Sequence, residues 1–485
     1  MLFLGLDLGT QSMKAVVCDD RMTVRGMHAV AISTSYPAPD RVEQDPRAWE
    51  AALAPAIGRA LAAAGARAED IAALAITGQL DGCVAVDPRG APVHPALIWQ
   101  DRRASAEAAR VAAADVFART GQMADASHLA PKVVWLRDHG VTAARFHQPV
   151  SYLVARLTGE SVIDPSLAST TMLLDLATSQ WSQPMLDAFA ITPAELPTVR
   201  ATCAIAGLLT VDGARLTGLT PGTRVAVGTG DDFTNLLGAG VTEPGTIVCA
   251  IGTAEVVGAL SLHPVLDRIG AEPLVETHVF PTGAYLIEHP GWLAGGAVRW
   301  ACDLLGLADD AELDRLAASV PAGADGVTFL PALAGAMTPV WRPHARGTLH
   351  GLGATHGKAH VARAVLEGLV FSTRDVFDRL RAMQLPATDV LLVGGGARSR
   401  IWAQLRADAL GVVHRTATNV DASPLGAAMI ASVAAAAHPD LASAARLIAA
   451  PTETFDPDSG LHDAIDEAYA RYRALGERLG LSSVV

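Results

Sequence analysis

Gly5-Leu6-Asp7-Leu8-Gly9-Thr10 (GLDLGT) lies near the start of the chain and ends an apolar run with a Gly-Thr loop. Related loops return at Ile251-Gly252-Thr253-Ala254 and at residues 394–399 (GGGARS). Each loop directly follows a short apolar stretch, as a turn after a strand would. Backbone N–H groups in such glycine turns can cradle phosphate oxygens, because glycine has no Cβ that would keep a ligand away. Three such loops, far apart in the sequence, predict one nucleotide held between two halves of the chain.

The residues around the first and third loops predict an α/β fold. Apolar runs at 2–6, 13–18 and 24–31, separated by turn residues, are typical of an antiparallel meander. Asp45-Pro46 supplies an N-cap and a favourable first position for a helix over 47–64, and 71–77 is expected to be a buried strand. Around the third loop, the pattern predicts a helix over 358–383, a strand at 390–393 and a helix over 399–410.

Length, charge and cysteine content limit the function classes. With 485 residues the chain is too long for one core, and we expect two domains that meet near residue 242. A net charge of -13 argues against nucleic acid as the main partner, and five scattered cysteines without CxxC spacing predict neither disulfides nor a zinc site. The apolar run 425–437 is shorter than the roughly 18 residues of a membrane span. We therefore expect a cytoplasmic protein with no membrane partner.

Two aspartates stand where a carboxylate can act in phosphoryl transfer. Asp231 and Asp232 follow an apolar strand and a Gly-Thr-Gly turn. Asp232 is expected to cap a helix, whereas Asp231 can accept the proton of a hydroxyl that attacks a γ-phosphate. Asp7 ends the first strand beside Gly9 and Thr10. A simply buried charge would be costly there, so we expect Asp7 to hold Mg²⁺ directly or through water.

The ordered set of motifs resembles the FGGY carbohydrate kinases of the sugar kinase, heat-shock chaperone and actin superfamily, and most closely the xylulokinases among them. The similar segments are GLDLGT at 5–10, VEQDPRAW at 42–49, Gly78-Gln79, APKVVWL at 130–136, LTGE at 157–160, GDD at 230–232, FLP at 329–331, GTLHGL at 347–352, AVLEGL at 364–369 and VGGGARS at 393–399. They cover nearly the whole chain, and chance would have to reproduce both their order and their spacing.

The resemblance implies a fold and a set of site residues. The fold is α/β, with two ribonuclease-H-like (actin-like ATPase) domains flanking a deep interdomain cleft. Sugar would bind on residues 1–241 and ATP mainly on residues 242–485, with Mg²⁺ as the metal. By position, Asp231 resembles the catalytic base and Asp7 the carboxylate of the metal site. Phosphate contacts are implied for Thr10, Gly252 and Thr253, and contacts near the adenosine for Gly395, Gly396 and Ser399.

Sugar recognition is where the sequence departs from the family. Xylulokinases usually have methionine and histidine in the positions of Leu80 and Asp81, and an ionised aspartate can only accept hydrogen bonds where histidine can donate. Ala336-Met337 replaces a common Glu-Arg pair, which alters the lip of the expected cleft.

The residues expected to contact the sugar are Gln79, Asp81, Trp99, Asp101 and Asp231. The alternative to sugar binding by the segment of Trp99 is a structural role, with a buried tryptophan and an exposed salt bridge. We prefer this structural role for Arg103. Lys132 is expected to be structural, and His128 to be a core or solvated histidine.

The predicted function is ATP-dependent phosphorylation of a terminal hydroxyl of a pentulose, with D-xylulose as the first candidate. A kinase for another ketose or for a polyol such as a tetritol is the alternative within the enzyme class. Outside that class, the same fold could serve as a sugar-binding sensor without kinase activity. Because dimers are common among the proteins that the chain resembles, a homodimer is the expected assembly.

Overall fold

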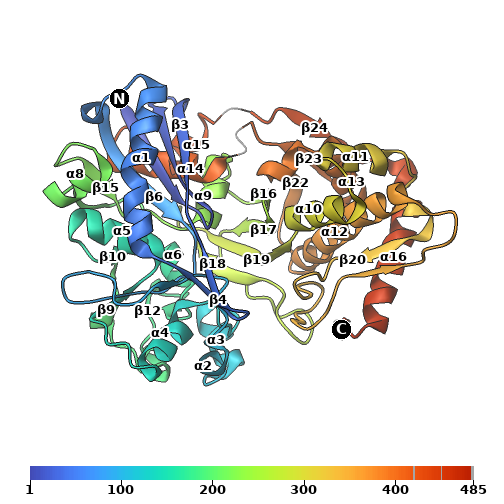
Figure 1. Cartoon of the computed structure of the whole chain (residues 1–485), viewed down its shortest axis with the longest axis horizontal. Coiled ribbons are helices and arrows are strands. Elements are labelled where there is room, and N and C mark those ends of the chain that lie inside the picture. Colours follow the sequence, from blue (N-terminus) through green and yellow to red (C-terminus); the bar gives the residue numbers. More distant parts are fainter. Residues whose placement is uncertain (419–420, 449, 482–485) are drawn as a thin grey trace. The chain divides into compact units, whose positions relative to one another are not determined.

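The chain forms two compact units, neither of which is one continuous stretch of sequence. The computed structural model describes residues 1–418, 421–448 and 450–481. Unit 1 comprises Met1–Thr242, Thr277–Leu286 and Asp421–Ile448, and unit 2 comprises Glu243–Glu276, Ile287–Val420 and Ala449–Val485 (Figure 1). Across the described ranges, no helix is both long and apolar enough to cross a bilayer.

The main sheet of unit 1 confirms the predicted meander. Strands β1, β2 and β3 pair antiparallel in sequence order, and β6 and β15 extend the sheet from β1 in parallel. The strand order is β14-β15-β6-β1-β2-β3. The bounds are β1 (Leu2–Leu8), β2 (Ser12–Asp19), β3 (Val24–Ala31), β6 (Ile71–Gly78), β14 (Ile205–Leu208) and β15 (Arg224–Ala226).

Two helices cover opposite faces of this sheet, and glycines let them approach it closely. A Cβ on Gly5 of β1 would overlap the backbone of α14 (Ala422–Ala434), and one on Gly26 of β3 would overlap the backbone of α1 (Pro46–Ala64). Gly5 pairs with Val16 and Gly26 pairs with Val17. Because successive residues of a strand point to opposite faces, α14 and α1 lie on opposite sides of the sheet.

The remaining elements of unit 1 form small sheets and helices around the main sheet. Short sheets pair β4 (Ser35–Ala38) with β5 (Arg41–Gln44) and β8 (Ala96–Leu97), β7 (Val84–Val86) with β9 (Arg145–His147), β10 (Val162–Ile163) with β13 (Thr198–Val199), and β11 (Leu174–Asp175) with β12 (Gln180–Trp181). The helices are α2 (Ser105–Ala108), α3 (Ala113–Thr120), α4 (Leu129–Asp138), α5 (Pro149–Thr158), α6 (Pro165–Ser169), α7 (Gln183–Ala188), α8 (Val211–Thr217), α9 (Asp231–Gly238) and α15 (Leu441–Ala445).

Unit 2 is built on a second mixed sheet. Near its centre a β-strand is followed by a glycine turn and then by a helix, as the sequence predicts for residues 390–410. The strand order of this sheet is β18-β19-β17-β16-β22-β23-β24, with β16 and β17 antiparallel and β16 and β22 parallel. The bounds are β16 (Gly245–Ile251), β17 (Ala254–Ser261), β19 (Tyr285–Leu293), β22 (Ala387–Val393), β23 (Val413–Thr416) and β24 (Glu453–Phe455). The chain passes between the units within β18 (Glu276–Val279) and again within β19.

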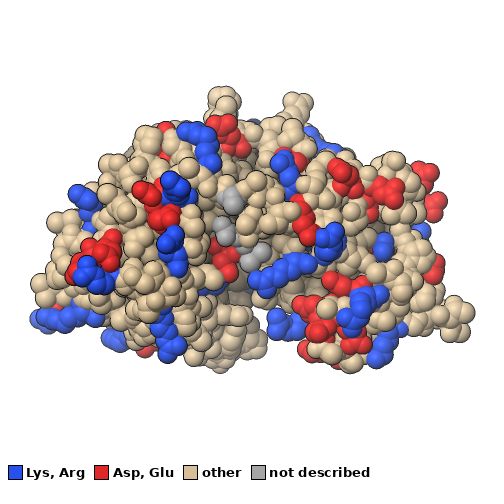
Figure 2. Space-filling model, turned by 90° about the horizontal axis from the view of Figure 1, so that it is seen from above, with Lys and Arg blue, Asp and Glu red and all other residues tan. Residues whose placement is uncertain are grey.

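The helices of unit 2 confirm the predictions made from periodicity. The long helix α12 (Lys358–Ala382) and the helix α13 (Arg400–Leu410) flank β22 in the sequence, as expected. The other elements are α10 (Gly295–Leu305), α11 (Asp310–Ala318), α16 (His462–Arg478), and the paired strands β20 (Thr328–Leu330) and β21 (Thr348–His350). Acidic and basic side chains are interspersed over the face of the molecule in Figure 2.

Candidate active site

The carboxyl ends of three parallel strands of unit 1 bring the predicted catalytic residues to one edge of the sheet. In the pairing of β1 with β6, Asp7 lies opposite Thr77 and Leu8 opposite Gly78. The Gln79 N–H donates to the Leu8 carbonyl at 2.9 Å. After β15 the chain returns to β6, since the Thr229 N–H donates to the Ile76 carbonyl at 3.3 Å. Ligands bind at this edge in many open α/β sheets.

Asp7 is a buried carboxylate with a raised pKa. Burial raises the pKa of Asp7 to about 6, and the nearby Lys14 acts against this increase. The Lys14 ammonium donates to Asp421 Oδ1 at 2.7 Å. Burial would lower the pKa of Lys14, but the hydrogen bond to Asp421 and the charges of Asp7, Asp421 and Asp231 raise it. Lys14 is therefore a charged group that interacts electrostatically with both predicted catalytic aspartates.

The environment of Asp7 fits a magnesium ion. Among the residues that the structure describes, the buried Oδ1 atom of Asp7 has no hydrogen-bond partner. Mg²⁺ is usually bound by one or two carboxylates together with substrate phosphates. The described residues contain no group of three or more acidic, histidine or cysteine side chains placed to hold a metal. The arrangement that remains is a single carboxylate beside the turn of Thr10, where phosphate contacts are predicted.

Asp231 is the first residue of α9 and lies next to the turn 79–82. We call 79–82 the substrate turn because it carries Gln79 and Asp81, two of the expected sugar contacts. Gly230 is the N-cap of α9, and a Cβ at this position would overlap the side chain of Leu80. The turn at Leu80 therefore packs directly on the start of α9. Asp231 and Asp232 both lie in the first helical turn, where a negative charge interacts favourably with the helix dipole. The expectation that Asp232 caps the helix is wrong, because Gly230 is the N-cap and Asp232 lies within the first turn.

Thr10, Gln79 and Trp99 belong to one hydrogen-bond network at this edge. Trp99 Nε1 donates to Thr10 Oγ1 at 3.0 Å, and Gln44 Nε2 donates to the Thr10 carbonyl at 2.7 Å. Gln44 Oε1 accepts from Gln79 Nε2 and from Trp49 Nε1, both at 2.9 Å. The buried Oε1 of Gln79 has no partner among the described residues. The network fixes the turn of Thr10 relative to the expected sugar-binding residues.

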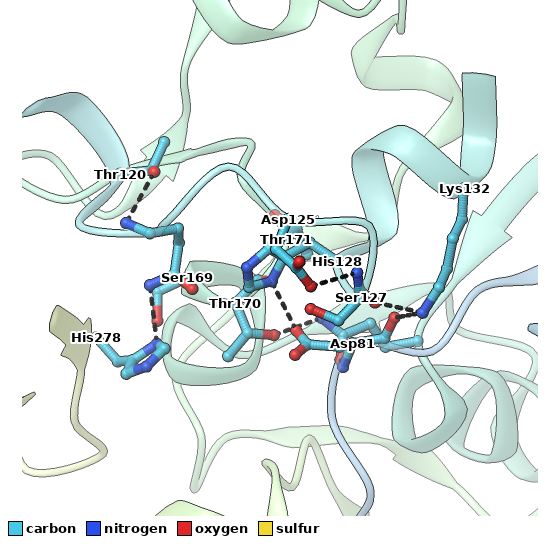
Figure 3. Close-up of polar contacts among 12 residues, drawn as sticks. Asp81, Thr120, Asp125, Ser127, His128, Lys132, Ser169, Thr170, Thr171 and His278 are labelled. Carbon is cyan, nitrogen blue, oxygen red and sulfur yellow. Dashed lines mark hydrogen bonds and ion pairs between the residues drawn. The ribbon is translucent and has the colours of Figure 1, made fainter. Parts of the chain in front are cut away.

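Asp81 is held from three sides (Figure 3). Its N–H donates to Gln148 Oε1 at 3.0 Å, and its carbonyl accepts from Lys132 Nζ at 2.8 Å. Its Oδ1 lies 3.1 Å from His128 Nδ1, which also lies 2.8 Å from the Thr170 carbonyl. Because both neighbours of Nδ1 are acceptors, His128 donates from Nδ1.

Asp81 stays ionised in this environment. Burial would raise the pKa of Asp81, but the charge and hydrogen bond of His128 and the charge of Lys132 hold it below its usual value. The side chain of Asp81 is 19% exposed, and its second oxygen, Oδ2, has no hydrogen-bond partner among the described residues. Its backbone φ of 60° is one that aspartate tolerates better than most residues. Asp81 is thus a fixed hydrogen-bond acceptor.

Lys132 and Asp101 hold the segments around the site. Lys132 is fully buried, and its Nζ donates to the carbonyls of Asp81, Ile98 and Ser127. Burial lowers the pKa of Lys132 to about 7. These contacts agree with the expected structural role of Lys132.

Asp101 is also fully buried. Its Oδ2 accepts from the Val42 N–H at 2.7 Å, and both of its oxygens accept from Arg103 Nε at 2.9 Å, which satisfies the buried carboxylate. Asp101 therefore orders the segment that carries Trp99. Its salt bridge with Arg103 is buried, where an exposed one was expected.

Three turns of unit 2 converge where the phosphate contacts are predicted. A Cβ on Gly394 would overlap the Ile251 carbonyl, and one on Gly396 would overlap the Ile251 side chain. The N–H of Gly295 donates to the Gly252 carbonyl at 3.2 Å and that of Gly296 to the Thr253 carbonyl at 3.0 Å. Gly252, Thr253, Gly395 and Gly396 are therefore brought together, and the Cβ position of Gly395 faces open space.

Sequence reasoning missed one of these turns, the start of α10. The adjacent glycines Gly295-Gly296 after an apolar strand were the available signal. Ser399, by contrast, has a structural contact of its own, because its Oγ accepts from the Trp402 N–H at 3.2 Å as the N-cap of α13. Ala336, one of the two departures from the family, is buried and its backbone pairs with Arg342.

Comparisons with known proteins identify the family of the chain. The family model for the N-terminal domain of the FGGY carbohydrate kinases matches residues 2–238, and the model for the C-terminal domain matches residues 247–435. The chain is 31% identical to a xylulose kinase of Escherichia coli, with 99% of each chain covered. It is 34% identical to a glycerol kinase of Myxococcus xanthus, with 98% of each chain covered. A solved xylulose kinase from Rhodospirillum rubrum is 28% identical, with a TM-score of 0.88 and 99% of each chain covered. These neighbours confirm the two-domain actin-like ATPase fold.

Proposed function

Because the chain belongs to the FGGY family of carbohydrate kinases, we propose that it transfers the γ-phosphoryl group of ATP to a terminal hydroxyl of a pentulose, with D-xylulose as the first candidate. The observation that carries the proposal is the meeting of Asp7, the turn of Thr10 and Asp231 at one sheet edge. The similarity to xylulose kinases over nearly the full chain supports D-xylulose as the substrate.

The chemistry can be assigned to these residues. The substrate hydroxyl oxygen forms a bond to the γ-phosphorus while the bond to the bridging oxygen of ADP breaks, and Asp231 accepts the hydroxyl proton. A magnesium ion bound by Asp7 would neutralise charge on the phosphates. Lys14 adds a positive charge near both aspartates. Phosphate oxygens would contact the turns of Thr10 and of Gly252-Thr253, and the adenosine would lie near Gly395, Gly396 and Ser399.

A polyol is the second candidate substrate, and Asp81 is the observation that favours it. The ionised Asp81 can accept a hydrogen bond from a hydroxyl but cannot donate one to a ketose carbonyl. Glycerol kinases match the chain at 34% identity, which is as close as the xylulose kinases. A substrate with a hydroxyl near Asp81 would therefore suit the turn 79–82 better than one with a carbonyl there.

The test is a coupled ADP-release assay with D-xylulose, glycerol and erythritol. Asp231→Asn should lower kcat by about 10²–10⁴-fold for the accepted substrate, because the proton acceptor is lost. Asp232→Asn, in the same helical turn, is the matched control and should retain most of the activity. Near-normal turnover of Asp231→Asn would overturn the assignment of the base. Substrate binding without ADP release in the unmodified protein would instead support a sugar sensor.

A further inference from the structure

Unit 1 contains a cavity that shares no lining residue with the candidate active site. It has a volume of about 330 Å³ and is bounded by the loop after β7, by β9 and by α5. This volume is within the usual range for pockets that bind small molecules. Neither the proposed phosphoryl transfer nor the family resemblance gives this cavity a role.

The cavity is lined by three arginines, Arg89, Arg145 and Arg156. Arg156 Nε donates to Glu50 Oε1 at 2.9 Å. Arg89 and Arg145 have no salt bridge to any residue that the structure describes. The one acidic residue in the lining, Asp87, accepts from backbone N–H groups of its own turn. Both arginines are exposed, so their guanidinium groups are hydrated and accessible to an anionic ligand.

Further polar atoms in the lining also lack partners. Ser161 lines the cavity, and its buried Oγ has no hydrogen-bond partner among the described residues. His147 is buried in the wall, with Nδ1 3.1 Å from Ser151 Oγ and no described partner for Nε2. Apolar side chains, among them Val86 and Ala155, complete the lining. The cavity therefore offers both charged donors and an apolar surface.

We propose that this cavity binds a small organic phosphate, whose phosphate group is held by Arg89 and Arg145 and whose carbon skeleton packs on the apolar wall. Guanidinium groups form paired hydrogen bonds to phosphate oxygens, which makes arginine the residue best suited to this group. The volume leaves room for a carbon skeleton in addition to the phosphate.

The position of the cavity connects this ligand to the substrate turn. His147, in the wall, is followed by Gln148, whose Oε1 accepts from the Asp81 N–H at 3.0 Å. Gln148 Nε2 donates to the Leu167 carbonyl at 3.0 Å. A ligand that displaces the end of β9 would therefore move the residue that fixes Asp81. Binding in the cavity and binding of the acceptor substrate should change each other's affinity by the same factor. This coupling rests on the proposed function, whereas binding in the cavity does not.

The binding test uses isothermal titration calorimetry on the full chain with ribose 5-phosphate, D-ribose and inorganic phosphate as probes. Ribose 5-phosphate should bind the unmodified protein, and an Arg89→Gln/Arg145→Gln variant should bind it at least tenfold more weakly. Arg59→Gln is the matched control, since Arg59 is exposed on α1 and does not line the cavity. An unchanged Kd in the double variant would overturn the proposal. So would equal binding of D-ribose, or binding of inorganic phosphate alone.

The coupling test measures KM for the accepted substrate with and without ribose 5-phosphate. KM should change in the unmodified protein and in Arg59→Gln but stay constant in the double variant, which should keep its basal activity. A change in KM that persists in the double variant would place the effect at another site. If the protein phosphorylates none of the acceptors, the calorimetric result still decides whether the cavity binds a phosphate ester.

Discussion

Replacing His128 by phenylalanine should weaken substrate binding without slowing the chemical step. Phenylalanine removes the donor that lies 3.1 Å from Asp81 Oδ1 and 2.8 Å from the Thr170 carbonyl. The Asp81 carboxylate then loses the contact that holds one oxygen and leaves Oδ2 for the substrate. The proposed phosphoryl transfer uses Asp231 and Asp7 and assigns no step to His128, so kcat should change by less than about threefold.

The magnitude follows from the type of contact that is lost. A hydrogen bond to a charged group contributes about 1.5–3 kcal/mol, and each 1.4 kcal/mol changes a binding constant about tenfold. If most of this energy is needed to orient Asp81, KM for the accepted substrate should rise about ten- to a hundredfold. His128→Asn keeps a side-chain N–H donor and should recover most of the loss. The two variants therefore separate a positioning role from simple packing.

The assay is steady-state kinetics by coupled ADP release, combined with thermal unfolding to confirm that each variant is folded. Asp81→Asn and the double variant with His128→Phe complete a double-mutant cycle, in which the two changes should not add because they act through one contact. A folded His128→Phe protein with KM within twofold of the unmodified value would refute the reasoning. Equal effects of phenylalanine and asparagine at position 128 would also contradict it.

Three further predictions concern stability. Arg406 and Glu255 form a fully buried ion pair with contacts of 2.5 and 2.6 Å. Arg406→Met should destabilise unit 2 by about 3–5 kcal/mol, because it leaves the buried charge of Glu255 without its partner. Adding Glu255→Leu should restore most of the lost stability, as measured by thermal unfolding. Gly5→Ala should lower the midpoint of urea unfolding, because the new Cβ would overlap the backbone of α14. Gly58→Ala should raise the midpoint slightly, because its Cβ would have no atom within 4 Å and alanine favours a helix over glycine. Equal midpoints for the two variants would contradict this prediction. Burial lowers the pKa of His414 to about 3, so the unfolded chain takes up this proton first as the pH falls. The free energy of unfolding, which is unaffected above about pH 6.5, should therefore decrease by about 4–5 kcal/mol towards pH 3, and by less in His414→Gln.

Local patterns were sufficient to predict the strands and turns that carry the site. Asp7, Thr10 and Gly252 follow apolar runs whose length and composition already indicate a strand and a glycine turn. The two-domain fold and the family resemblance are confirmed by the comparisons. The roles of the site residues stay predictions, since they require kinetic measurement.

Contacts between distant residues could not be predicted in this way. His128 was expected to be a core or solvated histidine, and it is buried, but its pairing with Asp81 joins positions 47 residues apart. Lys14 and Asp421 are separated by 407 residues, and neither neighbourhood contains a signal for the other. Such pairs are set by how strands and helices pack, and helical or strand periodicity in one sequence carries no information about them.

The assembly of unit 1 from separate segments has a consequence for folding during synthesis. The sheet face that carries Gly5 is covered by α14, which belongs to the segment Asp421–Ile448, far beyond Thr242. A ribosome that adds about 5–20 residues per second needs roughly 10–40 s to translate the approximately 200 residues between these points. During that interval the nascent chain displays an apolar surface, which makes it a natural client for a holding chaperone. A shortened chain that stops at Thr242 would retain that exposure permanently and should aggregate.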